Sequence, residues 1–473
     1  MKTDYLARMR DGEELSLSEQ ILMLTKLSIP AILAQISSIV MQYIDAAMVG
    51  RLGAQDSASI GLVSSSTWLL GGLCMAAGTG FTVNIAKRTG AKDEQGARNL
   101  VKTGLVCVVV FSLALAVLSA ALSPFLPKLL GAGEDIRKGA TIYFLVFALS
   151  LPFVQLNTTA AGMIQCSGNM KVAGILEIVM CALDVIFNAL LIFPSADYDI
   201  FGMKIHMIGA GLGITGAALG TALSEVVVSF ILLYYLLFRC KPLKLRKDQP
   251  MKFMKNELKG AFKIAFPVAI EQFVTCSAYI AFTRIVSPLG TIAIAANSFS
   301  ITAESLCYMP GYGIGAATAT IIGQSIGAKR FDLTKRLARL SVISGVLVMT
   351  AAGCLMYIFA REMIALLSPN PQIQELGASI LRIEAFAEPL YAASIVATGA
   401  FRGAGDTRVS TIINLISMWA VRIPLAAILG MSYGLTGVWT AMCIELCVRG
   451  TLFIILLLTR FRKRANNGQY FKI

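Results

Sequence analysis

Long apolar segments recur along the whole chain and are separated by short polar segments. Each apolar segment has about the ~20 residues that an α-helix needs to cross a ~30 Å hydrocarbon layer. We therefore predict twelve membrane-spanning helices. They cover approximately 27–50, 58–86, 99–122, 139–162, 172–193, 209–238, 260–286, 291–323, 335–359, 377–400, 408–430 and 434–459. The second and eighth exceed a single crossing, which predicts tilted or kinked helices.

The composition supports a membrane protein. Of the 473 residues, 56% are hydrophobic and only 14% are charged, whereas soluble domains have roughly 25% charged residues. This excludes a soluble globular or a disordered chain and predicts an all-α polytopic membrane protein. A net charge of +14 would suggest nucleic acid in a soluble protein. Here the basic residues lie in short segments between apolar ones, so we expect membrane lipids around the protein and no nucleic-acid partner.

The distribution of basic residues predicts the orientation. Of the 41 Lys and Arg residues, 31 lie in or beside the two tails and the loops on the same side, eight lie on the opposite side, and Arg422 and Arg449 lie within spans. The positive-inside rule then places both termini in the cytoplasm of a multi-pass cell (inner) membrane protein. No apolar signal-peptide core precedes the first span. The predicted organisation is a cytoplasmic tail with a short amphipathic helix over 1–26, a bundle over 27–238, a basic linker over 239–259, a second bundle over 260–459 and a tail over 460–473.

The two halves of the chain repeat each other at one offset of 237 residues. The matched positions include Pro30 and Pro267, Gln35 and Gln272, Gly90-Ala91-Lys92 and Gly327-Ala328-Lys329, Pro152 and Pro389, and Gly162 and Gly399. Six spans per half is an even number, so both halves enter the membrane from the same side. Such a parallel duplication indicates two pseudo-symmetric six-helix bundles, typical of transporters with a site between the bundles.

Polar side chains form a stripe on one face of the first span. Gln35, Ser38, Gln42 and Asp45 step by three or four residues, so they share a helical face. This stripe must face protein or water rather than lipid. A carboxylate inside a span is a functional candidate by default, because its burial in the membrane is costly.

The fifth span repeats this pattern with Asp184 and Asn188 stacked one turn apart, and the sixth span adds Thr221. With Asp45, these side chains would offer oxygen ligands for a hard cation such as Na⁺. Two close carboxylates would equally suit proton exchange. The alternative is a hydrogen-bonded network that only holds the bundle together.

The second half has its own acids in spans. Glu384 could lie at a hydrated rim. The candidates for the substrate cavity or a second-lobe site are Gln35, Ser38, Gln42, Glu271, Glu304, Glu388 and Tyr391. Arg422 needs a partner, for which Glu388 or Glu445 could serve; we favour a structural ion pair over substrate contact.

The cysteines, the single histidine and the glycine-rich run give weaker evidence for a functional site. The ten cysteines lie mostly within apolar segments, where small buried hydrophobes are the common role. The single histidine, His206, cannot support a His-based metal site. The run Gly311-Tyr312-Gly313-Ile314-Gly315 lies in a span, which favours close helix packing over a nucleotide loop. No HExxH, GxSxG or Walker sequence occurs, so we expect neither an enzyme nor a bound cofactor other than a coupling ion.

Several motifs together resemble the multidrug and toxic compound extrusion (MATE) family of bacterial antiporters. They are IDAAMVGRLGA (44–54), GFTVNIAKRTGAKDEQGARNL (80–100), LGTIAIAANS (289–298), MPGYGIGAATATIIGQSIGAKR (309–330) and ATGAFRGAGDTRVS (397–410). The resemblance implies a V-shaped pair of bundles around a cavity that alternates between the two membrane faces. It further implies export of amphipathic, often cationic, organic compounds in exchange for Na⁺ or H⁺, and a monomer.

The resemblance also implies residue roles. Asp45 matches the family's first-span acid, which binds the coupling ion, and Thr221 approximately matches a span-six hydroxyl ligand. The family's fifth span often reads N-x-x-x-D-P-x-L-I-F; here DVIFNALLIF (184–193) exchanges the two polar types, placing Asp184 on the Asn position and Asn188 on the Asp position. One branch has a coupling acid in span ten where this chain has Tyr391. We therefore favour an amino-terminal coupling site.

Two other functions remain as alternatives at this point. One is a flippase for lipid-linked sugars, from the related superfamily. The other is a membrane-embedded enzyme or receptor without transport. The family motifs argue against the first, and the repeat and the missing catalytic motifs against the second.

Overall fold

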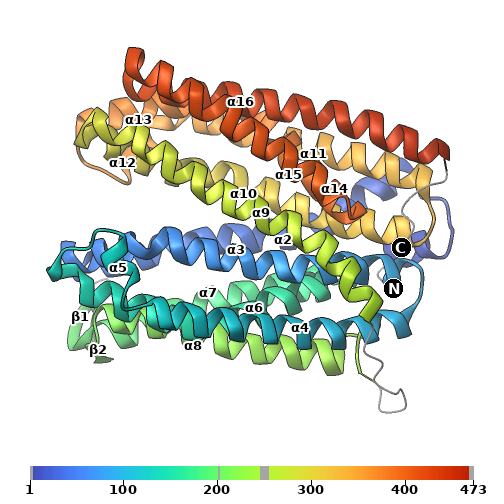
Figure 1. The fold of residues 1–473 in the computed structure, drawn as a ribbon, viewed down its shortest axis with the longest axis horizontal. Coiled ribbons are helices and arrows are strands. Elements are labelled where there is room, and N and C mark those ends of the chain that lie inside the picture. Colours follow the sequence, from blue (N-terminus) through green and yellow to red (C-terminus); the bar gives the residue numbers. More distant parts are fainter. Residues whose placement is uncertain (1–3, 201–202, 246–254, 468–473) are drawn as a thin grey trace.

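The computed structural model describes residues 4–200, 203–245 and 255–467. Its helices run roughly side by side in two layers (Figure 1). The first half of the chain, blue to green, forms one layer, and the second half, yellow to red, forms the other. The predicted all-α fold with two six-helix bundles is confirmed.

The amino-terminal lobe follows a short first helix. Its elements are α1 (Tyr5–Arg10), α2 (Leu17–Gly50), α3 (Ala54–Gly90), α4 (Glu94–Leu122), α5 (Leu126–Leu129), α6 (Glu134–Cys166), α7 (Met170–Ile192), β1 (Pro194–Ile200), β2 (Met203–Ala210), α8 (Ile214–Tyr234) and the π-helical turn η1 (Tyr235–Arg239).

The carboxy-terminal lobe is more interrupted. Its elements are α9 (Lys255–Val286), η2 (Ser287–Leu289), α10 (Thr291–Gly327), α11 (Phe331–Ile358), α12 (Ala360–Ala365), α13 (Pro371–Glu384), α14 (Glu388–Ala404), α15 (Thr407–Ile416), the π-helical turn η3 (Ser417–Arg422) and α16 (Ile423–Asn467).

The helices account for twelve membrane crossings when the breaks within the second lobe are taken into account. Nine helical stretches within the described residues are long and apolar enough to cross a membrane. The last of them, Thr407–Arg460, holds two crossings because the backbone turns sharply at Gly434. The other two crossings are α10, whose many small and polar residues are buried in protein, and the pair α13 and α14, which are separated by a break.

The helices differ from the predicted spans at three places. The helix that holds the first predicted span begins before residue 27, because α2 runs unbroken from Leu17, and Ser16 and Glu19 form a capping box at its start. The span expected over 209–238 begins later, because the β1–β2 hairpin occupies its first residues. The span expected over 377–400 is two helices. Part of the predicted linker, residues 246–254, lies outside the described residues.

The two lobes contact each other through helices that the duplication relates. Helix α2 packs on α10, and α9 packs on α3. Helices α3 and α10 also meet directly at the end that carries the α3–α4 and α10–α11 turns, which we call the basic end. A Cβ on Gly90 would overlap the Gln324 carbonyl, and one on Gly327 would overlap the Lys87 carbonyl. Backbone therefore lies on backbone, and the lobes are closed at the basic end.

Polar contacts reinforce this closure. Arg88 of α3 pairs with Glu257 of α9, and the Gln324 side chain donates to the Cys166 carbonyl at 2.7 Å. The Arg88 and Glu257 side chains are 22% and 14% exposed, whereas Gln324 is fully buried.

The segment before α2 bridges both lobes at the basic end. The Asp11 carboxylate lies 2.5 Å from Lys92 Nζ in the first lobe. Arg330 Nη1 of the second lobe donates to the Glu13 carbonyl at 3.1 Å. The hydrogen bond from Lys92 lowers the pKa of Asp11. Helix α1 itself buries Leu6 and Met9 in an apolar cluster to which both lobes contribute.

We predict that Gly327→Ala and Gly90→Ala each destabilise the closed arrangement by about 1–3 kcal/mol, the usual cost of forcing atoms into a packed contact. Equilibrium unfolding of the purified protein in detergent measures this. Gly71→Ala, on the same helix α3 but with no atom within 4 Å of the new Cβ, is the control and should stabilise by about 0.5–1 kcal/mol. Equal effects at the three positions would contradict the close approach.

Candidate functional site

A cavity of about 420 Å³ lies between the two lobes. Both lobes supply its walls, through α2, α3, α6 and α7 on one side and α9, α10, α14, α15 and α16 on the other. Of the residues predicted from sequence, Gln35, Glu271 and Tyr391 line it. Arg402 and Arg449 also line it, and the sequence reasoning did not assign them to the cavity.

The polar stripe on α2 is divided among different partners. Gln35 lines the cavity, and Ser38 donates to Glu177 Oε1 of α7 at 3.1 Å. Gln42 is exposed on the protein surface. Asp45 is half-buried and faces α7. Three of the four side chains therefore face protein or the cavity, whereas Gln42 is exposed.

Asp45 and Asp184 are brought together by one amide. Asn188 Nδ2 donates to Asp45 Oδ1 at 2.9 Å and to Asp184 Oδ2 at 3.0 Å. Asp184 is fully buried and Asn188 is 1% exposed. The two carboxylates lie close enough to interact directly. One amide N–H₂ group thus joins an acid on α2 to an acid on α7.

Helix α8 completes this group. Thr221 lies within reach of the Asp184 carboxylate, and Ser224 Oγ approaches Asp184 Oδ1 at 3.5 Å. A Cβ at Gly220 would overlap Asn188 Oδ1, so only glycine lets the amide lie this close to α8. The four predicted ligands, Asp45, Asp184, Asn188 and Thr221, therefore occupy one place in the first lobe.

This group supplies oxygen atoms suited to a small hard cation or to a shared proton. Asn188 Oδ1 is buried and accepts no hydrogen bond. Among the described residues there is no cluster of three or more His, Cys, Asp or Glu side chains able to hold a metal ion. A cation here would depend on amide and hydroxyl oxygens besides the two carboxylates.

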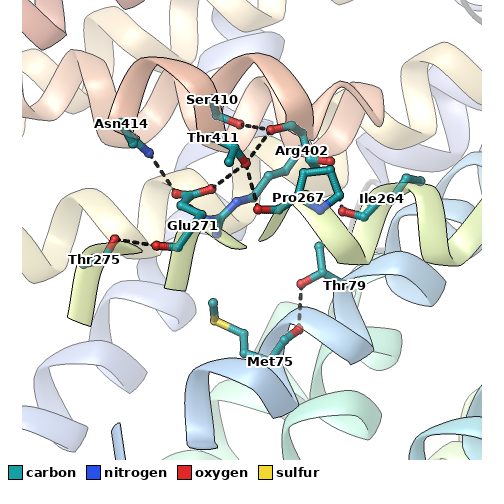
Figure 2. Close-up of polar contacts among 11 residues, drawn as sticks. Met75, Thr79, Ile264, Pro267, Glu271, Thr275, Arg402, Ser410, Thr411 and Asn414 are labelled. Atoms are coloured by element: carbon teal, nitrogen blue, oxygen red, sulfur yellow. Dashed lines mark hydrogen bonds and ion pairs between the residues drawn. The ribbon is translucent and has the colours of Figure 1, made fainter. Parts of the chain in front are cut away.

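Glu271 of α9 lies in a second polar group, shown in Figure 2. Its Oε1 accepts from Arg402 Nη2 at 3.2 Å and from Asn414 Nδ2 at 2.8 Å. Its Oε2 approaches Thr411 Oγ1 at 3.4 Å, and the same hydroxyl donates to the Pro267 carbonyl at 3.0 Å. Helix α9 is thereby fastened to α14 and α15 at the cavity wall.

Arg422 and Arg449 share one carboxylate. Arg422 Nη2 lies 2.7 Å from Glu445 Oε2, and Arg449 Nε lies 3.1 Å from Glu445 Oε1. Ser417 Oγ also donates to Glu445, which is fully buried. Glu445, and not Glu388, is therefore the partner of Arg422, and the expected structural ion pair is confirmed. Arg449 additionally stacks over Tyr391, 5.4 Å from the ring centre.

The acids Glu304, Glu384 and Glu388 lie deeper in the second lobe. They are 5%, 0% and 0% exposed. The hydrated rim considered for Glu384 is therefore wrong, because the α13–α14 break turns this residue into the lobe. None of the three belongs to the cavity lining. Of the two roles considered for Glu304 and Glu388, a place in the wall of this cavity does not apply, and a second-lobe site stays a prediction.

The comparisons with known proteins agree with this architecture. The MatE family model matches residues 30–190 and 267–428, two segments that begin at the paired residues Pro30 and Pro267. This chain belongs to the MATE family. The expected family membership is confirmed, and the protein is a multi-pass membrane transporter and not an enzyme.

Individual relatives cover nearly the whole chain. The chain is 27% identical over 449 residues to the probable multidrug resistance protein NorM of Thermotoga maritima, covering 93% of each chain. A solved outward-facing multidrug resistance MATE transporter superposes with a TM-score of 0.84 at 20% identity, covering 98% of this chain and 99% of the other. A MOP superfamily transporter from Pyrococcus furiosus, described by a reversed polarity of its binding pocket, gives a TM-score of 0.86 at 19% identity and covers 98% and 100%.

We predict that Glu271→Gln destabilises the protein by about 1–3 kcal/mol, because the Arg402 guanidinium loses its charged partner in a confined site. Unfolding of the purified transporter in detergent measures this. In the double variant Glu271→Gln/Arg402→Gln part of the loss should return, since no unpaired charge is left. Strictly additive losses would show that the two side chains do not interact.

Proposed function

We propose that this MATE transporter is a secondary antiporter that exports amphipathic, often cationic, organic compounds in exchange for Na⁺ or H⁺. The observation that carries the proposal is the Asp45–Asn188–Asp184 bridge within the first lobe. Carboxylates kept inside membrane-spanning helices are typical of ion pathways. The family membership and the multidrug names of the relatives support the substrate class.

The cavity between the lobes is the proposed substrate path. Its volume of about 420 Å³ falls within the ~300–1,000 Å³ of pockets for small organic molecules. Its walls carry apolar side chains and a few polar ones, among them Gln35, Glu177 and Glu271. Such a surface suits an amphipathic compound, whose apolar part needs contact area and whose charge needs a carboxylate.

The proposed cycle alternates access by rocking the lobes. The structure is closed at the basic end by the contacts of α3 with α10, which we assign to the cytoplasmic side of the cell (inner) membrane. Both termini would then be cytoplasmic. Binding of the coupling ion at Asp45 and Asp184 would neutralise this site and favour one closure over the other, since an ion shifts an equilibrium only by binding the two states differently.

The coupling site would use Asp45, Asp184, Asn188 and Thr221 together. Exchange of a proton would need only the two carboxylates, whereas Na⁺ would also use the amide and hydroxyl oxygens. We propose that the transporter works as a monomer within membrane lipids, because each lobe pair encloses its own cavity. The flippase alternative is not favoured, since curated relatives across the whole length carry multidrug names.

We predict that Asp45→Asn abolishes ion-driven efflux, because an amide can neither take up a proton nor neutralise a cation. Ethidium flux in proteoliposomes, with a Na⁺ gradient and a pH gradient imposed separately, measures this and identifies the ion. Asp332→Asn, which changes an exposed acid, should leave both responses intact. Retention of ion-driven flux by Asp45→Asn would refute the assignment.

The coupling ion can also be identified from the stability of the purified protein, without a transport assay. If Na⁺ is the ion, adding it at ~100 times its Kd should stabilise the purified protein by about 2.7 kcal/mol. Asp45→Asn and Asp184→Asn should lose that stabilisation. A wild-type protein that Na⁺ does not stabilise, but whose flux follows a pH gradient, would be proton-coupled.

A further inference from the structure

A second cleft lies at the basic end, between the start of α2 in the first lobe and the start of α11 in the second. We call it the α2–α11 cleft. Its volume is about 410 Å³. Helix α2 supplies Leu17 and Gln20 to its lining, and α11 supplies Arg336, Arg339, Leu340 and Ile343. None of these six described residues lines the cavity between the lobes, so the cleft is separate from the proposed substrate path.

Two arginine side chains line this cleft without a partner. Arg336 and Arg339 are exposed and lie three residues apart on α11, so they share one face of the helix. Within the part of the chain that the structure describes, no ion pair or hydrogen bond occupies either guanidinium. By contrast, Arg8, Arg88 and Arg330 at the same end are all bound to protein groups. The cleft therefore presents guanidinium donors that are free to bind a ligand.

The charge of the cleft is not balanced by protein carboxylates. Among the described residues, no acidic side chain belongs to its lining. Glu13 and Glu19, which flank the start of α2, both bind Arg8. Asp332 precedes Arg336 by one turn of α11, but it is exposed and forms no ion pair with any described residue. Two positive charges thus face the cleft, and they would attract an anionic ligand.

The position of the cleft along α11 is that of the membrane surface. Residues 340–358 hold no charged side chain. At ~1.5 Å per residue they span about 28 Å, close to the ~30 Å of the hydrocarbon layer. Further along the same face of α11, Ile343 and Leu347 are 57% and 66% exposed, which turns this face to lipid. Arg336 and Arg339 directly precede the uncharged stretch and therefore lie at the level of the lipid headgroups.

The rest of the lining suits acyl chains. Leu17 of α2 and Leu340 and Ile343 of α11 supply apolar surface beside the two arginines. Gln20 is buried, and its Nε2 already donates to the Leu15 carbonyl at 2.8 Å. A phospholipid would place its phosphate against the guanidiniums and its acyl chains against the apolar side chains. A soluble phosphate compound would leave that apolar surface uncovered, so the lining favours a lipid.

From these observations we propose that the α2–α11 cleft binds the headgroup of an anionic phospholipid. The lipid phosphate accepts hydrogen bonds from Arg336 and Arg339, because a guanidinium matches the geometry of phosphate oxygens. Basic pockets between membrane helices bind such headgroups. The bound lipid contacts both lobes, since α2 and α11 belong to different lobes, and it lies at the same end as the contact of Arg330 with Glu13. The site does not depend on the proposed antiport.

Native mass spectrometry of the purified protein in detergent tests the proposal, because it counts bound phospholipids at each lipid concentration. We expect the anionic lipid dioleoylphosphatidylglycerol to bind about 30-fold more tightly than zwitterionic dioleoylphosphatidylcholine, the effect of two arginines at a membrane surface. Arg336→Gln/Arg339→Gln should remove most of this preference. Lys329→Gln/Arg408→Gln removes two other exposed positive charges and should keep it.

Any of four results would overturn the proposal. The first two are equal affinity of the wild-type protein for the two lipids and an unchanged preference in Arg336→Gln/Arg339→Gln. The third is an equal loss in Lys329→Gln/Arg408→Gln, which would assign the preference to overall charge. The fourth is displacement of the lipid by glycerol 3-phosphate at the same concentration, which would make the cleft a site for a soluble phosphate. The single variants Arg336→Gln and Arg339→Gln, each expected to lose about fivefold in affinity, cover the case that the double variant does not fold.

Discussion

The structure depends on one constraint, which is that an ionisable group inside an apolar layer must be paired or neutralised. Each lobe meets it by joining helices through its charges. In the first lobe, one amide of Asn188 joins α2 to α7 through two carboxylates. In the second, Glu445 joins α16 to η3, and Glu271 joins α9 to α14 and α15. Groups that are costly to bury thus fix the register of the helices that carry them.

The duplication preserved the backbone contacts and changed the charges. Gly90 and Gly327 occupy equivalent positions, and each lies against a carbonyl of the opposite helix. By contrast, the position equivalent to Asp45 is Phe282, which is buried among apolar side chains of the second lobe. Close backbone approach tolerates no side chain, so both copies keep glycine. The charges have no such steric requirement and were free to diverge, which allows each lobe a different role.

Much of the fold and part of the site could be predicted from the sequence. The lengths of the apolar segments predicted the number of crossings. The four-residue step between Asp184 and Asn188 predicted that they share one helical face. The break between α13 and α14 was missed, because hydropathy does not fall at 385–387, and this also misplaced Glu384. The partner of Arg422 was left open between Glu388 and Glu445, since only the packing of η3 on α16 decides it. Local patterns predict elements, whereas choices among distant partners need the tertiary structure.

The distribution of strong and weak contacts indicates where the molecule can move. Within each lobe the charged contacts are buried, as for Glu445, and breaking them would leave a charge in an apolar interior. Between the lobes at the basic end, the contacts are backbone against glycine and partly exposed pairs such as Arg88 with Glu257. Because the Arg88 and Glu257 side chains are partly exposed, at 22% and 14%, water can solvate their charges when the lobes part. This distribution favours separation at that end while each lobe keeps its interior, so that the proposed ion binding would act on a whole lobe rather than on a single helix.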